Sequence, residues 1–421
     1  MNIIRRSFAK VNLSKKAEEL IAKDHKYNAQ NYAPLPIVIA KAEGAYVWDV
    51  DGKKYLDGIC SFSAMNQGHI HPRIKNKIIE QMNYSTLLGR GVYNDKLADA
   101  TEFLAKTFGY DRAILMNTGV EGGETAIKFA RRWGYDVKGI PDNQGWILFG
   151  SGNFWGRTMA ACGSSDDPDR YYHFGPYGMN FKILEYNNIE AFERELEQNP
   201  NVAGIMLEPI QGEACVNIPS PDFLKKIRAL CDKHKVMLII DEVQVGLGRT
   251  GKLLCQEHFG IRGDLVVLGK ALSGGFFPVS AVLGTEEAFK SIVPGTHGST
   301  FGGNPLAAVT AIESVKVLLE EGLIENSKVM GDRLLQGLKK RLEGSKYVGN
   351  FRGKGLFIGM DINEQYGPKM KDILLEVASQ GLLLKNPKAT KIRIAPSLTV
   401  NHSDVDFIIE TIGNVFGKYG K

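Results

Sequence analysis

Short apolar runs alternate with longer stretches of helical periodicity through the middle of the chain. Five such runs lie at residues 113–116, 145–149, 203–207, 236–240 and 265–268. Unbroken apolar runs of this length are typical of strands buried on both faces of a sheet. Residues 121–133, between two of the runs, repeat apolar positions at helical spacing. The alternation predicts an α/β fold with a mostly parallel sheet sandwiched by helices.

The pattern changes at both ends of the chain. Near the start, a charged helix at 15–26 precedes a hairpin whose strands at 46–49 and 54–57 are joined by Asp51-Gly52, a strong turn signal. Near the end, a long helix at 306–321 precedes short strands, including those at 355–360 and 391–394. We therefore expect three parts: an N-terminal segment (1–57) that joins the small domain, a large domain (58–302) and a smaller α+β domain (303–421).

Asp241 and Lys270 each follow a predicted strand of the large domain. Asp241 comes directly after the run at 236–240, and Lys270 opens a Gly-rich turn after the run at 265–268. Ligands of open α/β sheets bind at the carboxyl ends of the strands, where both side chains would lie. A structural ion pair is one interpretation. The other is a pyridoxal 5′-phosphate site, because that cofactor requires a lysine and an acid against its ring nitrogen.

Three further stretches follow strands and are candidates for the same site. Residues 117–120 connect a strand to a helix, which suits an anion site at the helix N-terminus, although Thr118 could be only an N-cap. In 153–158, Phe154 could stack on a planar ring and Arg157 could bind a carboxylate, whereas paired aromatic residues are also common in cores. The acids of 208–213 would lie at the sheet edge or in a surface loop.

Two other motifs do not support their usual function. Residues 246–252 match GxGxxG, but five residues separate the preceding strand from the glycines, and no acid follows at the required spacing. Leu253 stands where a phosphate-binding loop needs Ser or Thr. His69 and His71 would point to opposite sides of a strand, and no metal site is predicted there.

Composition narrows the class of protein. The 421 residues are 43% hydrophobic and 24% charged, with a net charge of +5 and no basic tract, so nucleic acid is not a predicted partner. The five cysteines lack a CxxC pair and are predicted to be reduced and buried. No apolar run reaches the roughly 20 residues of a membrane span. Residues 1–10 are predicted to be a basic arm on a cytoplasmic protein, with a short mitochondrial presequence as the alternative.

Nearly the whole chain resembles the class III aminotransferases, which have fold type I and bind pyridoxal 5′-phosphate. The resemblance is carried by the Asp241 and Lys270 motifs, by Ser299-Thr300, and by stretches such as Ser63 to His69 and Arg352 to Leu356. The stretches at 31–36 (NYAPLP) and 152–158 (GNFWGRT) point to the branch of the family that acts on ornithine.

The resemblance implies a set of contacts to the cofactor ring. Lys270 would form the Schiff base and later move the proton, and Asp241 would keep the ring nitrogen protonated. Gln244 would hydrogen-bond the ring hydroxyl, while Phe154 and Val243 would lie on its two faces.

It also implies how the cofactor phosphate is bound. Gly119 and Val120 would donate backbone N–H groups, with Ser299 close by. Thr300 would reach the phosphate of a partner subunit, so the resemblance implies a homodimer or a higher homo-oligomer.

The implied reaction moves the ω-amino group of L-ornithine to 2-oxoglutarate. Tyr32 and Arg157 would hold the distal carboxylate of the amino donor. Arg393 would bind the α-carboxylate of glutamate or 2-oxoglutarate, with Glu213 masking it in the other half-reaction. Phe62 stands where the family usually has a tyrosine whose hydroxyl helps to position the α-amino group of ornithine.

Two other departures also concern substrate choice: the segments 87–93 and 384–387 differ from the family pattern. Related donors therefore stay open, namely N-acetylornithine, 4-aminobutyrate and lysine. A different reaction on the same fold, an aminomutase or racemase, would need no 2-oxoglutarate.

Overall fold

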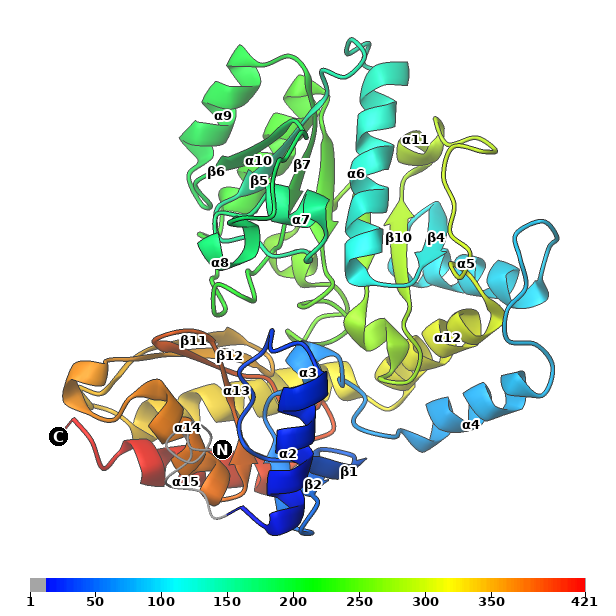
Figure 1. Cartoon of the computed structure of the whole chain (residues 1–421). Helices are drawn as coiled ribbons and strands as arrows, with labels where there is room; N and C mark the ends of the chain where they lie inside the picture. The colour runs from blue at the N-terminus through cyan, green and yellow to red at the C-terminus, as the bar shows by residue number, and fades with distance from the viewer. Residues whose placement is uncertain (1–12, 421) are drawn as a thin grey trace.

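The computed structural model describes residues 13–420, so the predicted basic arm at 1–10 lies outside the described residues. Its centre is a seven-stranded sheet (Figure 1). In spatial order the strands are β4 (Arg112–Met116), β10 (Ser280–Gly284), β9 (Leu265–Leu268), β8 (Met237–Asp241), β7 (Val202–Leu207), β5 (Trp146–Gly150) and β6 (Phe181–Leu184). Of these seven strands, β10 alone runs in the opposite direction to the others. The predicted α/β fold with a mostly parallel sheet is confirmed.

Both faces of this sheet are buried, which explains the unbroken apolar runs. In β8, Leu238 and Ile240 belong to the same apolar cluster as residues of α10 (Phe223–His234). Met237 and Ile239 face the other way and join the cluster formed with α6 (Gly119–Asp136). Successive residues of the strand therefore face opposite sides of the sheet and pack against different helices.

Helices surround the sheet and connect its strands. Besides α6 and α10 they are α3 (Cys60–Ser63), α4 (Pro72–Met82), α5 (Asp95–Phe108), α7 (Met159–Gly163), α8 (Pro168–Tyr171), α9 (Ile189–Gln198), η1 (Cys255–Phe259), η2 (Lys270–Ser273), α11 (Glu286–Phe289) and α12 (Pro305–Glu320). The last of these packs against α4, α5 and η2, all within residues 58–302.

The N-terminal segment contains α2 (Lys15–Tyr27) and three strands, β1 (Ile39–Glu43), β2 (Tyr46–Asp49) and β3 (Lys54–Asp57). The predicted hairpin is present as the antiparallel pair β2 and β3. β3 also pairs in parallel with β13 (Leu382–Leu383), so this segment is joined to the C-terminal part of the chain. In Figure 1 the blue segment accordingly lies beside the orange and red elements.

The C-terminal part is built around a four-stranded antiparallel sheet. Its strands are, in order, β11 (Val348–Lys354), β12 (Phe357–Ile362), β15 (Lys391–Ile394) and β14 (Lys385–Lys388). Its helices are α13 (Leu323–Arg341), η3 (Glu364–Tyr366), α14 (Met370–Ser379) and α15 (His402–Phe416). The three-part division at residues 57 and 302 remains a prediction, and α12 packs on the large-domain side of it.

The rejected motif at 246–252 forms the joint between the two parts. Arg249 has no exposed surface and donates hydrogen bonds to the carbonyl oxygens of Leu356 and Pro396, at 2.9 and 2.6 Å. A Cβ added to Gly251 would lie 3.1 Å from the Cα of Lys328 in α13. The glycines therefore allow close approach of two backbones, which is a structural role.

The turn labelled α3 is left-handed. Cys60, Ser61, Phe62 and Ser63 have φ of 46°, 47°, 61° and 72°. Such values are unfavourable for residues with a Cβ. Asp57 holds the turn, because its Oδ1 accepts hydrogen bonds from the backbone N–H groups of Ile59 and Cys60, at 3.0 and 2.9 Å. The backbone is therefore fixed where Phe62 faces the site described next.

Candidate active site

Asp241 is the last residue of β8 and is 4% exposed. Its Oδ1 accepts a hydrogen bond of 2.9 Å from the backbone N–H of Val243. Burial raises the pKa of Asp241 to about 6, while the Val243 hydrogen bond and the charge of Lys270 act in the opposite direction. A buried carboxylate needs a cationic partner, and the neighbouring cation is Lys270.

Lys270 follows β9 and begins the turn η2, with φ of 44°. Burial lowers the pKa of Lys270 to about 8, although the charge of Glu213 favours the ammonium form. Its side chain lines a cavity of about 290 Å³, together with Asn117, Thr118 and Gly119. A lysine in this state is partly neutral near pH 7.5 and can act as a nucleophile.

The N-terminus of α6 faces the same cavity. Thr118 and Glu121 form a capping box, in which the Thr118 hydroxyl accepts from the Glu121 amide at 3.3 Å. The first N–H groups of a helix lack intrahelical partners, and within residues 13–420 those of Gly119 and Val120 have no acceptor. They are free to bind an anion.

Position 119 has little room for a side chain. A Cβ there would lie 2.9 Å from Cγ1 of Val243. Gly269, just before Lys270, lies against the same valine, and a Cβ there would be 3.3 Å from it. The ends of β8 and β9 and the start of α6 thus meet around one side chain.

A second charged pair, Arg393 and Glu213, lies close enough to Lys270 to influence its pKa. Arg393 of β15 is 5% exposed, and its Nη1 lies 2.8 Å from Oε1 of Glu213. Gln244 contacts both, since its Oε1 accepts from Arg393 at 2.9 Å and its Nε2 donates to Glu213 at 3.2 Å. Burial opposes ionisation of Glu213, but the charges of Arg393 and Lys270 and these hydrogen bonds lower its pKa to about 2.

Glu208 connects the remaining parts of the site. Its carboxylate accepts from the backbone N–H groups of Phe154 and Gly212, at 3.0 and 3.1 Å. Burial raises the pKa of Glu208 to about 8, and the charge of Asp241 acts in the same direction. The sequence marked Glu208 only as an acid at the sheet edge. Its two backbone partners come from different loops and gave no signal in the sequence.

The predicted substrate residues differ in exposure and are not all in contact, since Arg393 is buried. Tyr32 and Arg157 are exposed, the former by 70%. The Arg157 guanidinium lies 5.8 Å from the Phe154 ring, and that of Arg393 lies 5.9 Å from the Phe62 ring. Phe62 and Arg393 therefore lie near each other in the structure. Tyr32 instead borders a separate groove beside α2 and α14.

Ser299 and Thr300 differ in exposure. The Ser299 hydroxyl accepts a hydrogen bond of 3.0 Å from Asn117 Nδ2, which places it at the N-terminus of α6. Thr300 is exposed. Another residue that sequence reasoning missed is Arg170, which is buried with its guanidinium 4.6 Å from the Phe154 ring.

His69 and His71 are not on a strand, contrary to expectation, because Ile70 between them has φ of 54° and His71 is the N-cap of α4. Each has a carboxylate partner, Asp57 and Glu321 respectively. Within residues 13–420 there is no cluster of three or more His, Cys, Asp or Glu side chains able to hold a metal. All five cysteines are buried and unpaired, as predicted.

The arrangement fits pyridoxal 5′-phosphate. The free amides of Gly119 and Val120 suit its phosphate, the depressed pKa of Lys270 suits its aldehyde, and the buried Asp241 suits its ring nitrogen. The three features border one site, although they come from residues far apart in the sequence.

Comparisons with known proteins agree with this chemistry. Residues 27–416 match the family described as aminotransferase class-III. The probable mitochondrial ornithine aminotransferase of Caenorhabditis elegans is 48% identical over 400 residues, 94% of each chain. The crystal structure of ornithine aminotransferase from Toxoplasma gondii has a TM-score of 0.93 at 39% identity, covering 99% of this chain and 97% of that one. An acetylornithine aminotransferase structure from Elizabethkingia anophelis has a TM-score of 0.86 at 37% identity, covering 96% of this chain and 100% of that one.

Proposed function

Because the chain belongs to the class III aminotransferases, we propose that it transfers the ω-amino group of L-ornithine to 2-oxoglutarate, with pyridoxal 5′-phosphate as cofactor. The products are glutamate and glutamate 5-semialdehyde, which cyclises to pyrroline-5-carboxylate. The observation that carries the assignment is the 48% identity to an ornithine aminotransferase across 94% of the chain.

When bound through a lysine, the cofactor supplies an electron sink for the substrate carbon that loses a proton. Lys270 would hold the cofactor and afterwards carry the proton on Nζ, for which a pKa of about 8 is suitable. Asp241 would keep the ring nitrogen protonated by its negative charge. Phe154 and Val243 would cover the faces of the ring, and Gln244 would reach its hydroxyl.

The Arg393 and Glu213 pair would let one site accept two kinds of substrate. The reacting end of ornithine carries no carboxylate, so Arg393 would stay paired with Glu213 during that half-reaction. The α-carboxylate of 2-oxoglutarate would replace Glu213 on Arg393, because a guanidinium can pair with either carboxylate. Arg157 would hold the carboxylate of ornithine that is far from the reacting amine. The same role for Tyr32 stays a prediction, because Tyr32 borders the separate groove beside α2 and α14.

Two observations favour other amino donors as alternatives to ornithine. One is Phe62, and the other is the structural similarity of the chain to an acetylornithine aminotransferase. Phe62 presents no hydroxyl to an α-amino group. N-acetylornithine, 4-aminobutyrate and lysine are therefore the alternatives, and an aminomutase or racemase is a more distant one.

The test is a panel of amino donors assayed at steady state with 2-oxoglutarate as acceptor. Ornithine is expected to have the highest kcat/KM. A higher value for N-acetylornithine or 4-aminobutyrate would refute the ornithine assignment and leave the transaminase assignment intact. Turnover without consumption of 2-oxoglutarate would instead indicate an aminomutase or racemase.

We further propose that the functional unit is a homodimer or a higher homo-oligomer. Large apolar side chains are exposed along residues 79–93, including Tyr84 at 80%, Val92 at 66% and Tyr93 at 105%. Exposed apolar patches of this kind mark protein interfaces. Phe301, next to Thr300, is 50% exposed as well. Thr300 would reach the cofactor phosphate of the partner subunit.

For the compartment we propose the cytoplasm, with the mitochondrial matrix as the alternative that the name of the C. elegans relative supports. Among residues 13–420, no helix has the length and apolar character needed to cross a membrane. Imaging the full chain with a fluorescent protein at its C-terminus distinguishes the two compartments.

A further inference from the structure

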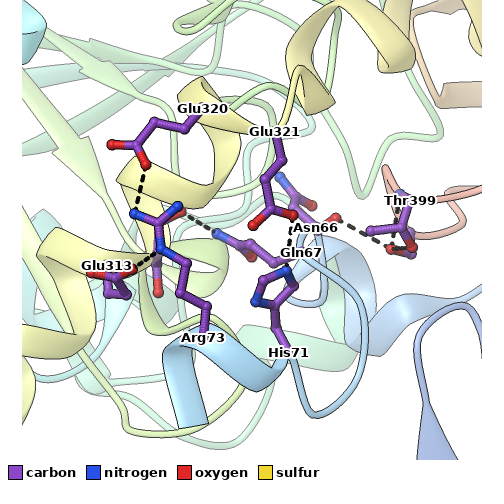
Figure 2. A network of polar contacts seen from close by, with 10 residues as sticks. Asn66, Gln67, His71, Arg73, Glu313, Glu320, Glu321 and Thr399 are labelled. Carbon is purple, nitrogen blue, oxygen red and sulfur yellow. Dashed lines mark hydrogen bonds and ion pairs between the residues drawn. The ribbon is translucent and has the colours of Figure 1, made fainter. Parts of the chain in front are cut away.

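The side chain of Gln67 is buried against the turn that carries Lys270. It is 1% exposed, and its Nε2 donates to the carbonyl oxygens of Ala271 and Ser314, both at 3.0 Å. Figure 2 shows Gln67 beside Asn66 on the loop that leads into α4. Because both partners are acceptors, the amide nitrogen must face them, which fixes the orientation of the side chain.

This turn needs support from its surroundings. Lys270 has φ of 44°, a conformation that residues with a Cβ adopt at a cost. Within the turn, the Leu272 amide donates to Gly269 at 2.9 Å and the Gly274 amide donates to Ala271 at 3.1 Å. The Ala271 carbonyl therefore accepts both a bond from the turn itself and the bond from Gln67.

The loop that carries Gln67 is itself anchored at the domain joint. Asn66 Nδ2 donates to the Leu247 carbonyl at 2.8 Å, and Asn66 Oδ1 accepts from Arg249 at 2.6 Å. The Leu398 amide donates to the Asn66 carbonyl at 2.9 Å. A fixed loop makes Gln67 a rigid clamp and not a mobile side chain.

We infer that Gln67 is a positioning residue for Lys270. Its amide ties the Ala271 carbonyl to α12 and so holds Lys270 in the left-handed conformation from which its side chain enters the cavity beside Gly119. This inference rests on the role proposed for Lys270, and it adds a residue that does not touch the cofactor or the substrate.

The test uses Gln67→Met, which keeps the length of the side chain and removes both N–H donors. In the cofactor-free protein, hydrogen exchange of the Leu272 and Gly274 amides is expected to become about tenfold faster, as for the loss of one or two hydrogen bonds. In the loaded enzyme, kcat is expected to fall about tenfold. KM for 2-oxoglutarate is expected to stay within about twofold, because Arg393 is untouched.

Thr399→Val is the matched control. Thr399 belongs to the same polar network in Figure 2, and its hydroxyl lies 2.8 Å from that of Ser397. No hydrogen bond joins it to the described residues of the Lys270 turn. This variant is expected to match the wild type in exchange of the turn and in kcat.

Gln67→Glu is a second test of the same hydrogen bonds, for the case in which the methionine variant fails to fold. A protonated glutamic acid can donate one hydrogen bond to either carbonyl, whereas the ionised form can donate none. The excess exchange of the turn amides should therefore shrink as the pH falls. Ionisation of a buried carboxylate also destabilises its surroundings in general, so the pH dependence supports the inference only where it is larger for the turn amides than for amides elsewhere in the protein.

Wild-type exchange and kcat in Gln67→Met would overturn the inference. Faster exchange spread evenly over the whole protein would also overturn it, since Gln67 would then be only structural. Lys270→Ala separates this from the proposed function: it should abolish the visible absorbance of the bound cofactor and all turnover. Full activity of Lys270→Ala would refute the role of the lysine, whatever Gln67 does.

Discussion

At the scale of single residues, burial changes the ionisation of the site in both directions. It raises the pKa of Asp241 to about 6 and of Glu208 to about 8, and it lowers the pKa of Lys270 to about 8. Glu213 shows the reverse balance, because Arg393 more than compensates for its burial. Burial and the nearby charges together set how far the pKa of each group departs from its ordinary value.

The pKa of Lys270 leads to a prediction about cofactor capture. Only the neutral amine attacks an aldehyde, and its fraction rises with pH until the pH exceeds the pKa. The rate at which cofactor-free protein captures pyridoxal 5′-phosphate should therefore rise with pH, reach half its maximum near pH 8 and level off above it. Stopped-flow absorbance measures this rate. A rate still rising above pH 10 would mean that Lys270 behaves as an exposed lysine.

Phe62 leads to a prediction about donor selectivity. A tyrosine hydroxyl there could accept one hydrogen bond from the α-amino group of ornithine, worth about 0.5–1.5 kcal/mol. Phe62→Tyr should therefore raise kcat/KM for ornithine relative to 4-aminobutyrate by about tenfold or less. The two donors are assayed in parallel with 2-oxoglutarate. An equal change in kcat/KM for both donors would show that residue 62 does not select between them.

The sequence predicted Asp241 and Lys270 because each follows an apolar run that is typical of a strand buried on both faces. It could not predict that Glu208 bonds to two loops, or that Gln244 bridges Glu213 and Arg393, since these contacts depend on how separate loops fold back over the sheet. Gln67 was visible only as part of a family motif.

At the scale of elements, the start of α6 depends on a close contact with the end of β8. Glycine at position 119 allows it, because a Cβ would lie 2.9 Å from Val243. Gly119→Ala should push the helix N-terminus away from the cavity and weaken binding of pyridoxal 5′-phosphate by about tenfold, equivalent to roughly 1.4 kcal/mol. Equilibrium titration of cofactor-free protein measures the dissociation constant.

Gly178→Ala is the control for that change, because no atom lies within 4 Å of a Cβ at position 178 and its φ is not in the left-handed range. It should bind the cofactor as the wild type does. If Gly119→Ala also binds with wild-type affinity, the phosphate is bound elsewhere.

Strand limits were predicted closely for four buried strands of the large sheet and for the hairpin of β2 and β3, but two strands of the large sheet were missed. The limits of β9 match the prediction, and those of β8 differ by one residue. β6 was not predicted, because as an edge strand it is only partly buried and its sequence FKIL includes a lysine. β10 was also missed; as the antiparallel strand of the sheet it is not followed by a long crossover helix.

At the scale of the whole molecule, the residues that we assign to the site come from two parts of one chain. Lys270 and Asp241 lie on the large sheet, whereas Arg393 lies on the C-terminal sheet, and residues 246–251 join the two. The exposed apolar surface at 79–93 lies outside both cores and is the surface we assign to the partner subunit.

A charge in that surface tests the assignment. Val92→Asp should convert the assembly to monomers, because an unpaired carboxylate is costly to bury in an interface. Turnover should fall with it, since Thr300 of the partner subunit would be lost from the site. Sedimentation velocity gives the oligomeric state, and Val329→Asp, at a 46% exposed position on α13, is the control. A wild-type protein that is monomeric and fully active would refute the proposed assembly.

The left-handed turn at residues 60–63 has a consequence for engineering. Glycine usually weakens a helical turn, but it adopts positive φ without a steric penalty. Ser61 is exposed and has φ of 47°. A glycine there would relieve about 1 kcal/mol of backbone strain, partly offset by the greater freedom of the unfolded chain. The chain keeps four residues with side chains in this conformation. We infer that it is less stable than it could be, and that the strained turn serves to orient Phe62.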